Sequence, residues 1–363
     1  RERCDAMLAC MSAGEVVRLT RLGRFTMDGS EGGALALLKR LRGGKGKGGG
    51  DVRRGSAGAQ QMRMLRRIPQ ILRFIPGTAQ DVRAYFLGLQ YWLAGSDDNV
   101  ANLVRFLVDR YADGPRRGLR GILKVQAPQE YPETGLYHPR MRGRIGDDPQ
   151  AIPGAGRAGT VGVLVMRSYV LAGNTAHYDG VIAALEARGM RAVPAFSFGL
   201  DARPAVEEFF VRDGRPLVDA IVSLTGFSLV GGPAYNDARA AEEMLAALDV
   251  PYLAAHPLEF QTLEQWQSSE RGLLPVEATM MVAIPELDGA TSPLVFGGRS
   301  SSAPVDRAHD MQAHPERADA LAARVARLIA LRRTPPCERR VGIVLFNFPP
   351  NAGSTGTAAH LSV

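Results

Sequence analysis

Polar side chains suited to acid–base chemistry or ligand binding lie in a turn that follows a predicted buried strand. The strand is VGVLVM, residues 161–166, and the stretch MRSYVLAGNTAHYDGVIAALEARG runs from residue 166 to residue 189. Its polar members include Arg167, Asn174, Thr175, His177 and Asp179. Ligands of doubly wound α/β domains sit in loops beyond the carboxyl ends of the strands, where a histidine or carboxylate could act as a general base. Spacing alone favours a simpler alternative, in which Asn and Thr cap a helix while His and Asp face water.

The elements that must position this turn alternate between strands and helices from residue 157 onward. Apolar runs predict strands at residues 161–166, 191–196, 219–224, 251–254 and 341–346. Helical spacing of apolar residues predicts helices at residues 179–188, 237–248, 263–268 and 317–332. Because such alternation is typical of a parallel sheet covered on both faces, we predict a multi-domain α/β fold with a Rossmann/flavodoxin-like parallel-sheet domain.

Changes in composition divide the chain into six predicted regions. Residues 1–42 read as the end of an N-terminal α/β domain, 43–58 as a Gly-rich basic flexible linker, and 59–113 as a helical region. Residues 114–158 read as an irregular connector, 159–334 as the α/β domain, and 335–363 as the truncated start of a further α/β unit. SDDN at residues 96–99 offers N-capping side chains for a helix over 100–111. Since both ends lie inside predicted units, we expect a fragment of a longer protein.

Composition excludes several classes of protein. A chain of 363 residues with 45% hydrophobic residues can form two or three domains with buried cores. No apolar run reaches the length of about 18 residues needed to span a membrane, and the first residues lack the apolar segment of a signal peptide. The three cysteines show no CxxC spacing, which argues against a disulfide framework or a zinc site. We therefore expect a soluble, cytoplasmic protein.

The net charge of +7 is local. Residues 1–70 hold 15 Lys and Arg against 6 Asp and Glu, whereas the rest of the chain is nearly balanced. No aromatic residues are interleaved in the basic Gly-rich segment, so a flexible insertion is favoured over a nucleic-acid platform. Contact of this segment with a membrane surface or an acidic partner subunit is an alternative hypothesis.

Neither Gly-rich segment is a nucleotide-binding P-loop. GKGKGGG lacks the Ser or Thr that follows the lysine of a P-loop, and NAGSTGTAA lacks the lysine itself. We therefore expect no ATP site of this kind in the chain.

Several long runs resemble one family of metal chelatases. They are SLTGFSLVGGPAYNDARAAEE, LDVPYLAAHPLEFQTLEQW, GLLPVEATMMVAIPELDG, VFGGRS, LFNFPPNAGSTGTAAHLSV, LQYWLAGSDDN and TGLYHP. The chain resembles the family formed by the large, porphyrin-binding H subunit of magnesium chelatase and the large subunit of cobaltochelatase. AGNTAHYDGVI resembles the magnesium branch, because cobalt enzymes typically lack the His-Tyr pair after AGNTA.

The resemblance implies a function, substrates and partners. It implies a part in the insertion of Mg²⁺ into protoporphyrin IX for (bacterio)chlorophyll biosynthesis, with ATP hydrolysed by AAA+ partners, the I and D subunits. One alternative is a cobaltochelatase large subunit acting on a corrinoid, and a second is a non-catalytic module for tetrapyrrole binding or subunit docking. The family's HG-x-x-E motif would follow Phe-Asn-Phe-Pro-Pro, beyond Val363. The catalytic residues would therefore be absent, and we expect the fragment alone to be inactive.

Insertion of a metal ion into a porphyrin requires particular types of side chain. Two pyrrole protons must leave the macrocycle, which requires a base, and Mg²⁺ prefers carboxylate oxygens. Glu277 interrupts an apolar run, so we expect it to be buried and partnered. His256 is expected in a loop, and Phe227, Tyr235, Phe260 and Trp266 in the core. The candidates for the porphyrin cleft are Arg167, Asn174, His177, Asp179, Glu259, Glu277, Glu286, Asp288 and Arg299, with no metal ligand assigned.

Overall fold

The computed structural model describes residues 69, 73, 79–232, 235–301 and 310–342. The regions predicted at 1–42 and 43–58, both Gly-rich segments and most of the strand predicted at 341–346 therefore lie outside the described residues.

Eight strands of the described residues form one sheet in the order β12-β11-β10-β7-β3-β4-β1-β2. Five of them are parallel neighbours at its centre, whereas β1, β2 and β12 pair antiparallel at the two sides. Their bounds are β1 Thr134–Tyr137, β2 Ile145–Gly146, β3 Gly159–Leu164, β4 Met190–Ser197, β7 Ala220–Ser223, β10 Tyr252–Thr262, β11 Thr291–Arg299 and β12 Met311–Ala313.

The parallel strands have the flavodoxin-like order. Numbered along the chain as β3, β4, β7, β10 and β11, they lie in the spatial order 2-1-3-4-5. The direction of winding reverses between β3 and β7, which makes their carboxyl ends the topological switch point of the sheet. This confirms the predicted α/β fold with a flavodoxin-like parallel sheet.

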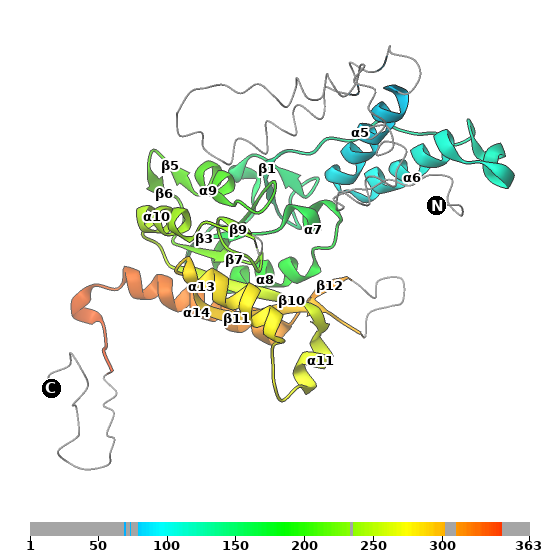
Figure 1. The fold of residues 1–363 in the computed structure, drawn as a ribbon. Coiled ribbons are helices and arrows are strands. Elements are labelled where there is room, and N and C mark those ends of the chain that lie inside the picture. Colours follow the sequence, from blue (N-terminus) through cyan, green and yellow to red (C-terminus); the bar gives the residue numbers. More distant parts are fainter. Residues whose placement is uncertain (1–68, 70–72, 74–78, 233–234, 302–309, 343–363) are drawn as a thin grey trace, which may run out of the picture.

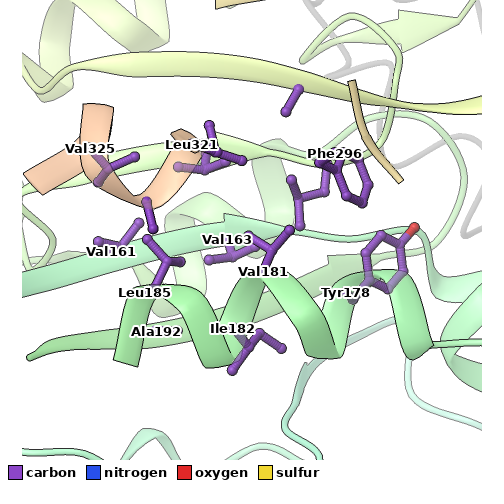
Figure 2. Close-up of a cluster of buried hydrophobic side chains, with 14 of the residues drawn as sticks. Val161, Val163, Tyr178, Val181, Ile182, Leu185, Ala192, Phe296, Leu321 and Val325 are labelled. Carbon is purple, nitrogen blue, oxygen red and sulfur yellow. The ribbon is translucent and has the colours of Figure 1, made fainter. Parts of the chain in front are cut away.

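Helices cover both faces of the sheet (Figure 1). On one face, α8 (Ala176–Ala187) and α14 (Pro315–Arg333) bury apolar side chains against β3, β4 and β11. Figure 2 shows Val181 and Leu185 of α8 beside Val161 and Val163, with residues of α14 completing the cluster. On the other face, α9 (Arg203–Phe209) and α10 (Ala238–Leu248) pack on β4, β7 and β10. The remaining longer helices are α5 (Ala79–Ala94) and α6 (Asp97–Tyr111).

Capping side chains set the starts of two helices, and the cap of α6 is the one that the sequence predicts. Ser96 accepts a hydrogen bond from Asn99 N at 3.2 Å and begins α6. Asp237 accepts one from Ala240 N at 3.1 Å and begins α10. These side-chain oxygens satisfy backbone donors that have no partner inside the first turn of a helix.

Beyond β10 the chain forms a set of short helices. They are α11 (Leu263–Ser268), α12 (Pro275–Glu277), the π-helical η4 (Ala278–Ala283) and α13 (Ile284–Leu287). A further short helix, α7 (Arg167–Leu171), follows β3. A π-helical turn is uncommon and is often found near functional sites.

Three differences from the sequence predictions stand out. The strand predicted at 251–254 continues to Thr262, because β10 gains a second parallel neighbour, β11, through an irregular ladder with register shifts at His256 and Leu258. That neighbour was not predicted, since Pro293 and the pair Gly297 and Gly298 weaken its strand pattern. The connector at 114–158 contributes β1 and β2 to the sheet.

None of the helices within the described part of the chain combines the length and apolar character needed to cross a bilayer.

Candidate functional site at the carboxyl edge of the sheet

The carboxyl ends of the parallel strands meet at one edge of the sheet, and most candidate side chains lie near it. A cavity of about 20 Å³ opens at the switch point between β3 and β7, and its lining includes Ser197, Ser223, Thr225, Phe227 and Ser228. A second, of about 40 Å³, lies between α5, residues 128–133 and the Arg167–Phe198 pair.

A larger cavity of about 440 Å³ lies at the opposite edge of the sheet. It is bordered by two ion pairs, Arg332 with Asp249 at 3.2 Å and Arg333 with Asp219 at 2.9 Å. We place the candidate site at the carboxyl edge despite this difference in size, because ligands of open α/β sheets bind there.

Tyr169, Glu259 and Arg299 form the cluster at the carboxyl edge that is best suited to acid–base chemistry or ligand binding. The Tyr169 hydroxyl donates a hydrogen bond of 2.5 Å to Glu259 Oε1, and Arg299 Nη2 lies 3.6 Å from Glu259 Oε2. Burial, followed by the hydrogen bond to Glu259, raises the pKa of Tyr169 well above its usual range. The hydroxyl therefore remains a donor. The Glu259 side chain is 24% exposed, so this carboxylate can still accept a proton or a hydrated cation.

His177 lies behind this cluster in an aromatic stack. Its ring is 3.8 Å from the Tyr178 ring, 5.8 Å from Phe296 at an interplanar angle of 11°, and 5.1 Å from Tyr169 edge-on, measured between centroids. Its buried ring nitrogens have no hydrogen-bond partner, and burial lowers the pKa to about 3. The side chain is thus a neutral packing residue, with no contact to solvent through which it could take up a proton as a base.

Asn174 and Asp179 hold the ends of the turn in place. Asn174 Oδ1 accepts a hydrogen bond of 2.8 Å from Met311 N, at the start of β12. Asp179 accepts hydrogen bonds from Tyr137 and from Arg144 at 2.5 and 3.2 Å, which tie β1 and the following loop to α8. Both side chains therefore have structural partners.

Arg167 anchors the connector to the carboxyl edge. Its Nε donates to Pro132 O at 2.9 Å and its Nη2 to Tyr131 O at 3.2 Å. The guanidinium carbon lies 5.5 Å from the centroid of the Phe198 ring, within the range of a cation–π contact.

The other acidic candidates divide by burial. Glu277 is buried and accepts hydrogen bonds from Gln261 Nε2, Phe260 N and Leu274 N at 2.5, 3.3 and 3.2 Å, as expected from the apolar run around it. Asp288 is also buried; it accepts a bond of 2.8 Å from Leu229 N, and burial raises its pKa. Glu286 is exposed on α13. Glu277 and Asp288 therefore join segments of the fold.

Three expectations for single side chains were wrong. His256 lies buried within β10, not in a loop, because the strand continues past it; its ring nitrogens lack partners and burial lowers its pKa to about 4. Tyr235 and Phe260 are more than half exposed, so they are not core residues. Sequence reasoning also missed Tyr169, whose signal was its place in the first turn of the helix directly after β3.

The described residues contain no group of three or more His, Cys, Asp or Glu side chains arranged to hold a metal ion. The cluster of Tyr169, Glu259 and Arg299 thus has one carboxylate, that of Glu259, with which it can bind a cation.

Comparison with known proteins gives the family. Residues 89–363 match the family model described as CobN/Magnesium Chelatase. The chain belongs to the CobN/magnesium chelatase family. The match includes every strand of the sheet and the whole carboxyl edge, while residues 1–86 match a model described as a domain of unknown function.

Relatives within the CobN/magnesium chelatase family differ in how closely they match. The magnesium-chelatase H subunit of Rhodobacter capsulatus is 52% identical, over 100% of this chain and 30% of that protein. The aerobic cobaltochelatase CobN protein of Pseudomonas aeruginosa is 32% identical, over 64% of this chain and 18% of that protein. The solved catalytic subunit of cobaltochelatase from Mycobacterium tuberculosis is 27% identical, over 71% of this chain and 20% of that chain, with a TM-score of 0.49. The chain thus spans about 30% of the length of the curated relative from Rhodobacter.

Proposed function

We propose that this chain is part of the large subunit of a magnesium chelatase that binds protoporphyrin IX for ATP-dependent Mg²⁺ insertion in (bacterio)chlorophyll biosynthesis. The observation that carries the proposal is the 52% identity to a magnesium-chelatase H subunit over the whole chain. The cobalt relative reaches 32% over 64% of the chain, which makes a corrinoid cobaltochelatase the second candidate.

In this proposal the carboxyl edge forms one wall of the macrocycle cleft. The half-buried Glu259 faces the developing metalloporphyrin, where its carboxylate can accept a hydrogen bond from the hydration shell of Mg²⁺ or a pyrrole proton. Tyr169 and Arg299 hold that carboxylate in one orientation through the contacts described above.

ATP hydrolysis belongs to separate AAA+ proteins, the I and D subunits, in the same proposal. The sequence supports this division, because neither of its Gly-rich segments has the composition of a P-loop. The complex acts in the cytoplasm. Mg²⁺ dehydrates reluctantly, which gives a physical reason to couple its insertion to conformational work.

Titration of the full-length protein with two macrocycles tests the proposal. We expect protoporphyrin IX to bind at least about tenfold more tightly than hydrogenobyrinate diamide, a difference of about 1.4 kcal/mol. Tight binding of the corrinoid alone would establish the cobalt candidate in its place. Binding of protoporphyrin IX without chelation, in the presence of Mg²⁺, ATP and the partner subunits, would leave a non-catalytic tetrapyrrole-binding module.

A further inference from the structure

A basic arm projects from the body of the molecule between α6 and β1. It consists of residues 114–124, starting with the 3₁₀ turn η2 (Gly114–Leu119). Residues 114–122 are exposed without interruption, and the exposed Asp113 directly precedes them. Figure 1 shows the arm extending beyond the end of α6, away from the sheet.

The charge of the arm has a single sign. Arg116, Arg117, Arg120 and Lys124 all lie within it, and residues 114–129 contain no Asp or Glu. Its base is fixed to α6, because Arg120 Nε donates to Ala112 O at 2.5 Å and Gly121 N donates to the Asp109 carboxylate at 2.6 Å. The basic side chains of the arm therefore extend from a turn that is hydrogen-bonded to the end of α6.

Large aliphatic side chains share this surface. Ile122 is 72% exposed and Leu119 is 44% exposed, between the cationic side chains of the arm. Val104 is 56% exposed on the neighbouring helix α6. Single exposed aliphatic residues are common on protein surfaces, but two of them at a projecting turn surrounded by cations form an amphipathic tip.

We propose that the basic arm binds an anionic lipid surface, a role that goes beyond the proposed chelatase function. Cationic side chains near such a surface are attracted to its headgroups, and aliphatic side chains can enter the boundary between headgroups and acyl chains. The projecting, convex shape favours a bilayer over an acidic protein, because a protein would need a matching pocket to cover Ile122. The arm is a different part of the sequence from the basic segment at residues 43–58.

Vesicle sedimentation with the full-length protein tests the proposal. We expect binding to vesicles of phosphatidylglycerol mixed with phosphatidylcholine, little binding to phosphatidylcholine alone, and weaker binding as salt concentration rises. Each basic side chain near an anionic surface strengthens binding about fivefold, so the double variant Arg117→Glu/Lys124→Glu should lose at least about 25-fold. Ile122→Asp should lose about tenfold, because it removes the inserting aliphatic group.

A matched control separates the arm from overall charge. The double variant Arg327→Glu/Arg340→Glu reverses two exposed charges far along the chain, like the arm variant, and it should bind vesicles within about twofold of the unaltered protein. Circular dichroism and protoporphyrin IX titration confirm that each variant is folded. Equal binding to neutral vesicles, or arm variants that bind like the control, would overturn the proposal. Loss of partner-subunit binding with vesicle binding unchanged would do the same and would assign the arm to a protein.

Discussion

At the scale of single residues, burial separates the candidate side chains into those that hold the fold and those that can meet a substrate. Glu277, Asp288 and His177 are almost completely buried, whereas Glu259 and Arg299 keep part of their polar groups accessible. A buried charge needs partners, and Glu277 has three donors; His177 has none and is neutral. The same residue types thus serve structure or chemistry according to their surroundings.

The pKa of His177 gives the first prediction. Because the folded-state pKa of about 3 lies below the unfolded value of about 6.5, the unfolded chain binds more protons between these pH values. The contribution of His177 to the free energy of unfolding is therefore fully present above pH 6.5, and it is lost progressively as the pH falls toward 3. Between pH 7 and pH 5, His177 should cost about 2 kcal/mol of the free energy of unfolding.

Urea titration of this chain at the two pH values measures the effect. His177→Phe keeps an aromatic ring in the stack and should remove about 2 kcal/mol of the pH-dependent loss. His314→Asn serves as the control, because His314 lies in a hydrogen bond with Gln267 that is exposed to solvent. An unchanged pH dependence in His177→Phe would show that the ring is accessible to protons.

At the scale of elements, close packing fixes which residues can join a helix to a strand. Gly180 lies in α8, and a Cβ placed on it would be 2.3 Å from the Cβ of Ala313 in β12. Gly297 has a similar role in β11, because its added Cβ would be 2.4 Å from Gln312 O. α8 and β11 can thus pack closely against the short edge strand β12 because Gly180 and Gly297 have no Cβ atom.

Gly180→Ala therefore should destabilise the protein, even though alanine is about 1 kcal/mol better than glycine inside an exposed helix. Overpacking against Ala313 costs about 1–3 kcal/mol, so we expect a net loss in the free energy of unfolding. Ala313→Gly in the same chain should restore most of the loss by making room for the new methyl group. Urea titration of both single variants and the double variant measures the coupling; a stabilising Gly180→Ala would contradict the packing described here.

The sequence predicted the elements better where they depend on local patterns. The apolar runs of β3, β4 and β7 and the capping residue Ser96 are visible in the chain itself. By contrast, β11 contains a proline and two adjacent glycines, and it becomes a strand through its pairing with β10. Its glycines are needed because Leu258 lies within 2.6 Å of the Cβ position of Gly298. Such a requirement has no local signal.

At the scale of the whole molecule, the two edges of the sheet have different roles. The carboxyl edge brings together Tyr169, Glu259 and Arg299, which are up to 130 residues apart in the chain, near the carboxyl ends of β10 and β11. The amino edge holds the cavity of about 440 Å³, which is bordered by the ion pairs of Arg332 and Arg333. We therefore expect the proposed macrocycle to change the protection of backbone amides at the carboxyl edge and not at the amino edge.

Hydrogen exchange of the full-length protein tests this asymmetry. Protoporphyrin IX should slow amide exchange in residues 165–174, 197–200 and 256–262, by about tenfold or more where the loops become ordered. Residues 155–159 and 249–251, at the amino edge, should exchange at unchanged rates. Protection at the amino edge alone would place the macrocycle in the other cavity and would contradict the role proposed for Glu259.

The sequence by itself determined the α/β class, most of the parallel core strands, the cap of α6 and the resemblance to the chelatase family, because these depend on periodicity, capping chemistry and long motifs. Only the tertiary structure decided which polar residues are accessible. His177 and Glu259 are both polar residues in segments that resemble the family, yet one is enclosed by aromatic rings and the other is partly exposed between Tyr169 and Arg299. The reason is physical: accessibility and pKa depend on neighbours brought together by the pairing of β10 with β11 and the packing of α7 and α8, and these neighbours are distant in the chain.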